Sequence, residues 1–374
     1  MPRVKLGDVA REYKAISKEN TGMPIVGLEH LTPGDITLSQ WDEGIETTFT
    51  KAFKKGQMLF GRRRAYLKKA ALAPFDGVCS GDIIVIEAIP ERIDPALLPF
   101  IIQSDLLFDF AVGNSAGSLS PRVKWESLRE YEFELPEMGE QEKLVQLLEA
   151  AYQAKKSYQV LLNATDNLVK SQFIEMFGSL GTDEKGWGLT TLGKCCELNP
   201  KRPKDIDDEL WVSFVPMPAV SEDGRLSASE MKQYAEVKKG FTYFAENDVL
   251  FAKITPCMEN GKGCVAEGLS NGIGAGSTEF HVLRPIAGKS NPFWLYILTM
   301  HDAFRSAARQ SMTGTGGQLR VPISFLDDYP ITLPPVELQE EFEQMVRQSD
   351  KSKFELKQSI ERIDSLIKSL IQQS

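Results

Sequence analysis

Short apolar runs bounded by turn residues fill most of this chain, and two long stretches without proline or glycine interrupt them. In the first half the runs predict strands at residues 23–28, 57–60 and 83–87, followed by a mostly apolar helix at residues 97–112. The second half repeats this order, with strands predicted at residues 211–216, 249–254 and 279–283 and a helix at residues 292–309. Strands and helices are mixed and strand pairing is non-local, so the pattern predicts an α+β fold.

The two stretches without proline or glycine, residues 140–177 and 337–374, predict helices of roughly 35 residues. In each, apolar or small side chains alternate at spacings of three and four, which is the seam of a coiled coil. The first seam contains Leu144, Leu147, Ala151, Ala154, Tyr158, Leu161, Thr165 and Leu168. The second contains Phe342, Val346, Ser349, Lys353, Leu356, Ile360, Ile363, Ile367 and Leu370. Stripes this narrow do not stabilise isolated helices, so we expect the two helices to pack on each other in antiparallel order.

The two halves also share short sequence matches in the same order. Leu6-Gly7 returns as Leu192-Gly193 (192 − 6 = 186), and Leu135-Pro136 returns as Leu333-Pro334 (333 − 135 = 198). Gln141-Glu142 returns as Gln339-Glu340, again at an offset of 198. An offset that grows and then stays fixed is typical of insertions in surface loops. The pattern therefore predicts a duplicated domain with an approximate two-fold axis.

Composition narrows the class of protein. The chain is 42% hydrophobic and 25% charged, as globular proteins are, and contains no apolar run of about 20 residues that would cross a membrane. The N-terminal segment lacks the apolar core of a signal peptide. Five cysteines at unmatched positions argue against a disulfide framework and favour a reducing cytoplasm. The net charge of −9 is unfavourable for a nucleic-acid binder, unless basic residues gather on one face.

Such a cluster exists between residues 47 and 75, where eight lysines and arginines occur without an acidic residue. Arginine can hydrogen-bond guanine through two nitrogens, lysine can hold phosphate, and an aromatic ring can stack. The candidate DNA-binding residues here are Arg62, Arg63, Arg64, Tyr66, Lys68 and Lys69. The matching segment of the second half is also polar and basic, and its candidates are Lys253, Thr255, Asn260 and Lys262. A solvated turn is the alternative interpretation of the first cluster.

A second matched stretch runs over residues 117–124 and 314–321, and it combines one glycine in the first copy and three in the second with polar residues and an arginine. Its candidate DNA-binding residues are Arg122 and Lys124 in the first half and Thr315, Gln318 and Arg320 in the second. The amide of Gln318 has the two-pronged geometry that adenine accepts. A plain connecting loop is the alternative.

No catalytic or metal-binding arrangement is found in the sequence. The three histidines have no partner spacing, and the cysteines lack the CxxC spacing of a zinc site. The GxGxG at residues 271–276 lacks the following helix of a dinucleotide-binding loop, so we expect a loop or hairpin turn there. Residues 313–317 lack the ending of a phosphate-binding Walker loop, and residues 199–201 do not match the catalytic loop of an amino-methyltransferase.

Together, the duplicated domains, the two long helices and the repeated junctions resemble the specificity subunit of type I restriction–modification systems. The resemblance rests on Leu6-Gly7-Asp8 and Leu192-Gly193-Lys194 at the domain starts, and on the segments from Leu135-Pro136 to Gln141-Glu142 and from Leu333-Pro334 to Gln339-Glu340. It covers nearly the whole chain. It implies target-recognition domains at residues 1–136 and 179–334, and conserved-type helices at residues 137–178 and 335–374.

The resemblance further implies that each globular domain reads one half of a bipartite, asymmetric DNA site, while the helices fix the unread spacer. Two methyltransferase subunits would dock on the helices and motor–nuclease subunits would join them, so that this chain is not itself an enzyme. S-adenosylmethionine, ATP and Mg would belong to those partners, and this chain would hold no cofactor and no metal. The helix residues assigned to partner binding are Leu144, Tyr158, Leu161, Leu168, Phe342, Leu356, Ile360, Ile363 and Ile367.

Two other classes of protein compete with this interpretation. A two-headed coiled-coil scaffold that binds only proteins would have the same helices, but it leaves the basic run at residues 47–75 unexplained. A stand-alone methyltransferase or nuclease would need the catalytic motifs that the sequence lacks.

Overall fold

A computed structural model describes residues 2–17, 22–227 and 230–372 of the chain. Its contacts divide the chain into two units: unit 1 comprises Met1–Val160 and Lys357–Ser374, and unit 2 comprises Leu161–Leu356. Both units mix helices with strands, so the α+β class predicted from the sequence is confirmed. Each unit is built from one globular part and from portions of the two long helices.

In unit 1, four antiparallel strands form a sheet in the order β2 (Ala10–Glu12), β8 (Ile83–Ala88), β5 (Met58–Gly61) and β6 (Ala70–Leu72). A smaller sheet has the order β3 (Ile25–Val26), β7 (Gly77–Cys79) and β4 (Lys51–Phe53), with β3 and β7 parallel. A two-stranded ladder joins β1 (Arg3–Lys5) to β9 (Glu132–Glu134). The three strands predicted in this half are present as β3, β5 and β8.

Unit 2 repeats these three strand arrangements and adds an edge strand at Glu230–Gln233 and a two-stranded ladder within residues 313–320. Its four-stranded sheet has the order β11 (Cys196–Leu198), β18 (Phe280–Pro285), β15 (Val249–Ala252) and β16 (Gly263–Val265). Its second sheet has the order β13 (Glu230–Gln233), β12 (Trp211–Val215), β17 (Ile273–Gly276) and β14 (Thr242–Ala245), again with one parallel pair, β12 and β17. A ladder joins β10 (Leu189–Thr191) to β21 (Pro330–Thr332). The duplication inferred from short sequence matches is therefore a duplication of topology, with β13 as an added edge strand.

Each predicted globular helix is in fact two helices. Residues 97–112 form α2 (Leu98–Ile102) and α3 (Asp105–Gly113), because the Ser104 side chain caps α3 by accepting from the backbone N–H of Leu107 (3.3 Å). Residues 292–309 form α7 (Pro292–Met300) and α8 (Asp302–Ser311), and His301 caps α8 in the same way. A polar cap inside an apolar run ends one helix and begins the next.

These short helices cover the four-stranded sheets at equivalent points. In unit 1 the ring of Phe108 on α3 stacks on that of Phe60 on β5, with centroids 5.3 Å apart. In unit 2 Phe304 on α8 meets Phe251 on β15 edge to face, at 5.8 Å. All four side chains are fully buried, so both cores are built around the same sheet–helix contact.

The loop predicted at residues 271–276 is wrong for its last four residues, because they form the interior strand β17 (Ile273–Gly276). A Cβ atom on Gly274 would overlap the ring of Phe244, and one on Gly276 would overlap the carbonyl oxygen of Val215. Glycine is placed here by close packing within a sheet and not by a turn.

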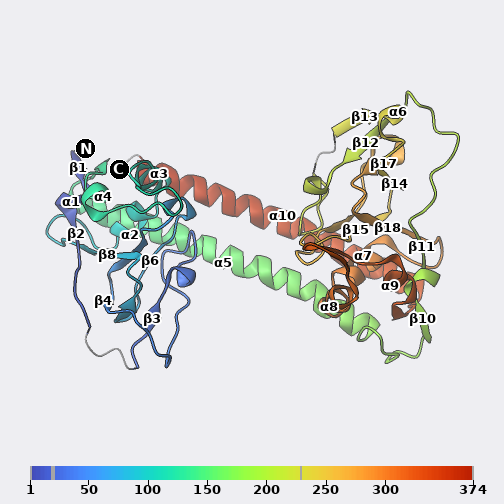
Figure 1. Ribbon diagram of the computed structural model, residues 1–374, viewed down its shortest axis with the longest axis horizontal. Coiled ribbons are helices and arrows are strands. Elements are labelled where there is room, and N and C mark those ends of the chain that lie inside the picture. Colours follow the sequence, from blue (N-terminus) through green and yellow to red (C-terminus); the bar gives the residue numbers. More distant parts are fainter. Residues whose placement is uncertain (1, 18–21, 228–229, 373–374) are drawn as a thin grey trace. The chain divides into compact units, whose positions relative to one another are not determined.

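The two long helices are α5 (Met138–Phe177) and α10 (Val336–Gln372), and they lie side by side within each unit (Figure 1). In unit 1 the first half of α5 packs with the last turns of α10, where Ile367, Leu370 and Ile371 contact the core that includes Leu148 and Tyr152. In unit 2 the last turns of α5 pack with the first half of α10, where Phe342 lies 5.6 Å from Phe173 and 5.2 Å from Phe177. The antiparallel order is thus found in both units.

The seam predicted for α10 is confirmed, because every one of its residues is buried or half-buried. The seam predicted for α5 is confirmed in part, since Ala151 is buried and Leu144, Ala154, Tyr158 and Thr165 are half-buried. Leu147, Leu161 and Leu168 are each at least half exposed, and the buried face also includes Val145, Leu148, Tyr152, Val169, Phe173 and Phe177. The helix carries two neighbouring apolar stripes, and the larger aromatic side chains decide which of them faces the core. Within the described part of the chain, none of the helices combines the length and the hydropathy of a membrane span.

Candidate nucleic-acid interface

The basic cluster of unit 1 is a tight loop directly after strand β5. Arg64 and Lys68 adopt left-handed backbone conformations (φ of 53° and 50°) on either side of a single 3-10 turn, η2 (Ala65–Leu67). This folding leaves Arg64 and Tyr66 exposed, with Tyr66 at 55%. Lys69, in contrast, donates to the carbonyl oxygen of Leu28 (2.6 Å), and Lys68 pairs with Asp105 (2.6 Å). The candidate DNA-binding residues exposed at the tip of this loop are therefore Arg64 and Tyr66.

The second candidate stretch of unit 1 lies against this loop. The backbone N–H of Arg64 donates to the carbonyl oxygen of Pro121 (2.8 Å), and that of Val123 donates to the carbonyl oxygen of Arg62 (3.0 Å). The Arg63 side chain donates through Nε to Ser120 Oγ (2.5 Å). The two segments singled out separately in the sequence thus form one continuous surface.

A carboxylate that was not predicted as a site residue pairs with the arginines of this surface. Asp82, just before β8, accepts from Nε and Nη2 of Arg122 at 2.7 and 3.3 Å, and it lies 3.6 Å from Arg63. Hydrogen bonding to Arg122, with the charges of Arg122, Arg63 and Arg62, lowers the pKa of Asp82. Asp82 is therefore ionised at neutral pH and orients the half-exposed Arg122.

Unit 2 builds the same frame from different residues. The backbone N–H of Thr255 donates to the carbonyl oxygen of Leu319 (3.0 Å), and that of Val321 donates to the carbonyl oxygen of Lys253 (2.9 Å). Glu279, just before β18, accepts from Nε and Nη2 of Arg320 at 2.9 and 2.8 Å, and this pairing lowers its pKa. Asp82 and Glu279 also share a local hydrogen bond. The backbone N–H of Asp82 donates to Ser80 Oγ and that of Glu279 donates to Ser277 Oγ, each at 3.2 Å. A serine two residues before an acid at the start of matched strands was the signal available in the sequence.

The glycine-rich stretch of unit 2 is a β-hairpin of β19 (Thr313–Thr315) and β20 (Gln318–Arg320), and not a plain loop. Its tip exposes Thr315 and Gln318. The hydroxyl of Thr255 ties the hairpin to the sheet, because it donates to the carbonyl oxygen of Gly317 (2.9 Å) and accepts from the N–H of Leu319 (3.1 Å). Where unit 1 presents Arg64 and Tyr66, unit 2 thus presents Thr315 and Gln318.

The remaining candidates lie apart from these tips or are partly covered. Asn260 donates to Glu222 (3.0 Å), and Lys262 donates to the carbonyl oxygen of Met217 (3.4 Å). Lys124 is exposed at the start of α4 (Trp125–Leu128). Arg62 and Lys253 occupy equivalent half-buried positions. Burial lowers the pKa of Lys253, and the Nε of Arg62 is buried with no hydrogen-bond partner among the described residues.

The helix residues assigned to partner binding fall into three groups, which are exposed, fully buried and half-buried. Leu161 and Leu168 are 50% and 53% exposed on α5. Phe342 is fully buried against Phe173 and Phe177, so its side chain is occupied within unit 2. The other assigned residues are half-buried: Leu144, Tyr158, Leu356, Ile360, Ile363 and Ile367.

Comparison with known proteins supplies the family context for this frame. A family described as type I restriction modification DNA specificity domain matches residues 3–162 and 184–364. Over 153 residues, which are 40% of this chain and 25% of the relative, the chain is 44% identical to the type I restriction enzyme EcoEI specificity subunit of Escherichia coli. Over 192 residues, 50% of this chain and 32% of the relative, it is 40% identical to the EcoAI specificity subunit of Escherichia coli. These matches thus span about a quarter to a third of the curated relatives' length.

A solved chain from work on complex assembly and conformational transition of the type I R-M system has a similar fold. The two align with a TM-score of 0.56 and 20% identity, over 99% of this chain and 96% of the other.

Proposed function

Since this chain belongs to the family of type I restriction–modification DNA specificity domains, of which it carries two copies, we propose that it is the specificity subunit of such a system. Residues 1–136 and 179–334 are assigned as target-recognition domains, each of which reads one half of a bipartite, asymmetric site in double-stranded DNA. Residues 137–178 and 335–374 are assigned as the helices that set the distance between the half-sites.

One observation in particular supports the assignment of the two domains to half-sites of different sequence. The same backbone contacts and the same arginine–carboxylate pair recur in both units, as Arg122–Asp82 and Arg320–Glu279. The exposed side chains differ, however, since unit 1 exposes Arg64 and Tyr66 on the loop after β5, whereas unit 2 exposes Thr315 and Gln318 on the hairpin of β19 and β20. Arginine favours guanine edges and glutamine favours adenine edges. Because the two units share the same supporting contacts but expose different side chains, we expect the two half-sites to differ in sequence.

The helices are proposed to dock two methyltransferase subunits, through the exposed stripe of α5 that contains Leu161 and Leu168. Leu147, Leu161 and Leu168 are each at least half exposed and are spaced by multiples of seven residues, so they lie on one face of α5 as the residues of a helix-packing seam do. Motor–nuclease subunits would join this core in the cytoplasm. We assign S-adenosylmethionine, ATP and Mg to the partners and a non-catalytic role to this chain.

The test is to co-express the chain with its methyltransferase partner and to determine methylated positions across the genome. We expect a bipartite motif with two unlike halves at a fixed spacing, and no methylation by the purified chain alone. A single contiguous motif would refute the bipartite assignment. Methylation without any sequence preference would favour the two-headed protein scaffold instead.

A further inference from the structure

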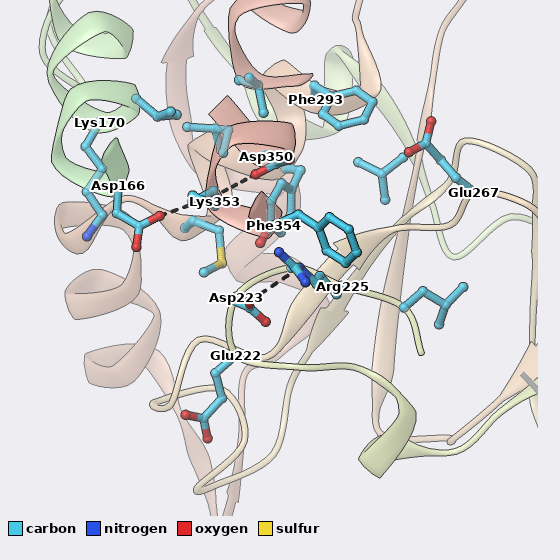
Figure 2. Close-up of a pocket in the computed structure, with 18 residues that line it drawn as sticks. Asp166, Lys170, Glu222, Asp223, Arg225, Glu267, Phe293, Asp350, Lys353 and Phe354 are labelled. Carbon is cyan, nitrogen blue, oxygen red and sulfur yellow. Dashed lines mark ion pairs between the residues drawn. The ribbon is translucent and has the colours of Figure 1, made fainter. Parts of the chain in front are cut away.

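Two ion pairs join the long helices, one in each unit. In unit 1 the Nζ of Lys155 on α5 lies 2.6 Å from the Oδ1 of Asp364 on α10. In unit 2 the Nζ of Lys353 on α10 lies 3.1 Å from the Oδ1 of Asp166 on α5, and 2.7 Å from that of Asp350 (Figure 2). The two lysines are equivalent in the duplication (353 − 155 = 198), and so are the two aspartates (364 − 166 = 198). The duplicated lysines and aspartates thus form two equivalent ion pairs, each of which joins α5 to α10.

Both lysines reach their partners from positions that are largely covered. The side chains of Lys155 and Lys353 are 17% and 15% exposed, although the sequence placed Lys353 inside an apolar seam. Burial lowers the pKa of Lys353, but hydrogen bonds and charges from Asp350 and Asp166 outweigh burial and raise it. A covered lysine is tolerated in a seam only where carboxylates meet it.

The two pairs obey one antiparallel register. Lys155 and Asp166 are eleven residues apart on α5 (166 − 155), and Lys353 and Asp364 are eleven apart on α10 (364 − 353). If Lys155 faces Asp364, an antiparallel alignment therefore places Asp166 opposite Lys353. The same alignment places Phe177 opposite Phe342, whose rings are 5.2 Å apart. Polar and aromatic contacts therefore specify the same register.

A parallel arrangement of the two helices would replace these attractive charge contacts with repulsive ones. In a parallel alignment of the duplicated helices, equivalent positions face each other, so Lys155 would meet Lys353 and Asp166 would meet Asp364. Like charges across a helix interface are unfavourable, and charge pairs at coiled-coil edges set partner orientation.

We propose that Lys155, Asp166, Lys353 and Asp364 are positioning residues that select the antiparallel order and register of α5 and α10. This selection is a property of the fold and does not rest on the proposed function. Its consequence for the DNA spacer does rest on that function, because the register of the helices would fix the separation of the two readers.

The test exchanges the two charges on one helix. The variant Lys155→Asp/Asp166→Lys keeps the composition and net charge but places like charges at both contacts of the antiparallel pair. We expect its melting midpoint to fall by at least about 4 °C, with a broadened transition. Adding Lys353→Asp/Asp364→Lys restores opposite charges at both contacts, and this quadruple variant is expected to recover most of the loss. The matched control is Lys143→Glu/Glu149→Lys, which exchanges two exposed charges of α5 and should leave the midpoint unchanged.

Melting of the full chain decides the inference without any DNA. A double variant that melts like the parent, or a quadruple variant that stays as low as the double, would overturn it. In the complex with the methyltransferase, the quadruple variant should also restore the parental spacer. If melting follows the expected order while no bipartite methylation is found for any variant, the proposed function fails and the register assignment stands.

Discussion

Gln339 donates through Nε2 to the carbonyl oxygen of Pro334 at 2.8 Å, and Gln141 makes the same bond to Pro136 at the same distance. Each glutamine also accepts through Oε1 from a backbone N–H across the junction, that of Asn291 or of Asp94, at 2.8 Å. Both side chains are almost fully buried. The repeated Leu-Pro and Gln-Glu motifs of the sequence are therefore a structural joint between each globular part and its long helix.

This joint predicts a large loss of stability for Gln339→Ala. The change leaves the N–H of Asn291 and the carbonyl oxygens of Pro334 and Lys289 without their partner. We expect a loss of about 3 kcal/mol and a fall in the melting midpoint of about 6–12 °C. Gln344→Ala, at an exposed position of the same helix, is the control and should change the midpoint by less than about 2 °C. Equal midpoints for the two variants would contradict the role of the joint.

The sequence was sufficient for features that depend on local periodicity, and insufficient for those that depend on distant contacts. The seam of α10 and the strands β5 and β15 follow from spacing alone. The exposed and buried stripes of α5 differ by one residue, so only Phe173 and Phe177 in their packed positions identify the buried one. Asp82 and Glu279 were missed because they lie 40 and 41 residues from the arginines that they hold.

The exposed arginine of the first reader predicts a specific defect in DNA binding. Arg64→Asn preserves the left-handed backbone, which asparagine tolerates, while removing the charge. We expect binding to a cognate site to weaken by roughly tenfold or more. If Arg64 contacts phosphate, the salt dependence falls by about one unit of slope, and if it reads guanine, specificity relaxes at one position.

Arg92→Ala is the matched control for that experiment, because Arg92 is an exposed arginine beyond the opposite end of strand β8 from Asp82. Its affinity and salt slope should equal those of the parent. Unchanged binding by Arg64→Asn would remove the loop after β5 from the interface.

Substitutions at neighbouring residues of α5 test partner docking and folding separately. Leu168 is 53% exposed and Val169 is 5% exposed. Leu161→Ser/Leu168→Ser should weaken binding of the methyltransferase subunit, measured by titration calorimetry, by roughly tenfold while leaving the melting midpoint nearly unchanged. Val169→Ser should do the reverse and lower the midpoint, because it introduces a hydroxyl into the core of unit 2. A stable double variant with full affinity would exclude this stripe from docking.

A buried histidine predicts acid sensitivity in unit 2. His281 is 5% exposed, its Nε2 lies 2.9 Å from the carbonyl oxygen of Val321, and burial lowers its pKa. The unfolded chain therefore takes up the proton at a higher pH than the folded chain does. This contribution to stability is complete above about pH 6.5 and is lost as the pH falls below it. Glu279 and Asp82, whose pKa values are lowered, lose theirs only at more acidic pH.

Melting curves between pH 7.5 and pH 5 test this assignment, with His281→Gln as the variant and His301→Gln for comparison. The glutamine amide can still donate to the carbonyl oxygen of Val321, and it does not titrate. We expect a flatter pH dependence for His281→Gln. His301 is less buried and its pKa is also lowered by burial, so its replacement should flatten the curve less. An unchanged slope in the His281 variant would contradict the assignment.

The proposed ruler predicts a change in spacer length when both helices are lengthened together. Residues 156–162 of α5 and 357–363 of α10 are matched by the antiparallel register, so duplicating both heptads keeps the flanking ion pairs facing each other. Seven residues are nearly two helical turns, so the apolar face is preserved, and they add about 10 Å. At about 3.4 Å per base pair this equals roughly three base pairs. The methylated motif should keep both half-sites and gain a spacer of about three positions. Duplicating the α5 heptad alone breaks the register and should lower the melting midpoint instead. An unchanged spacer in a stable double duplication would refute the ruler.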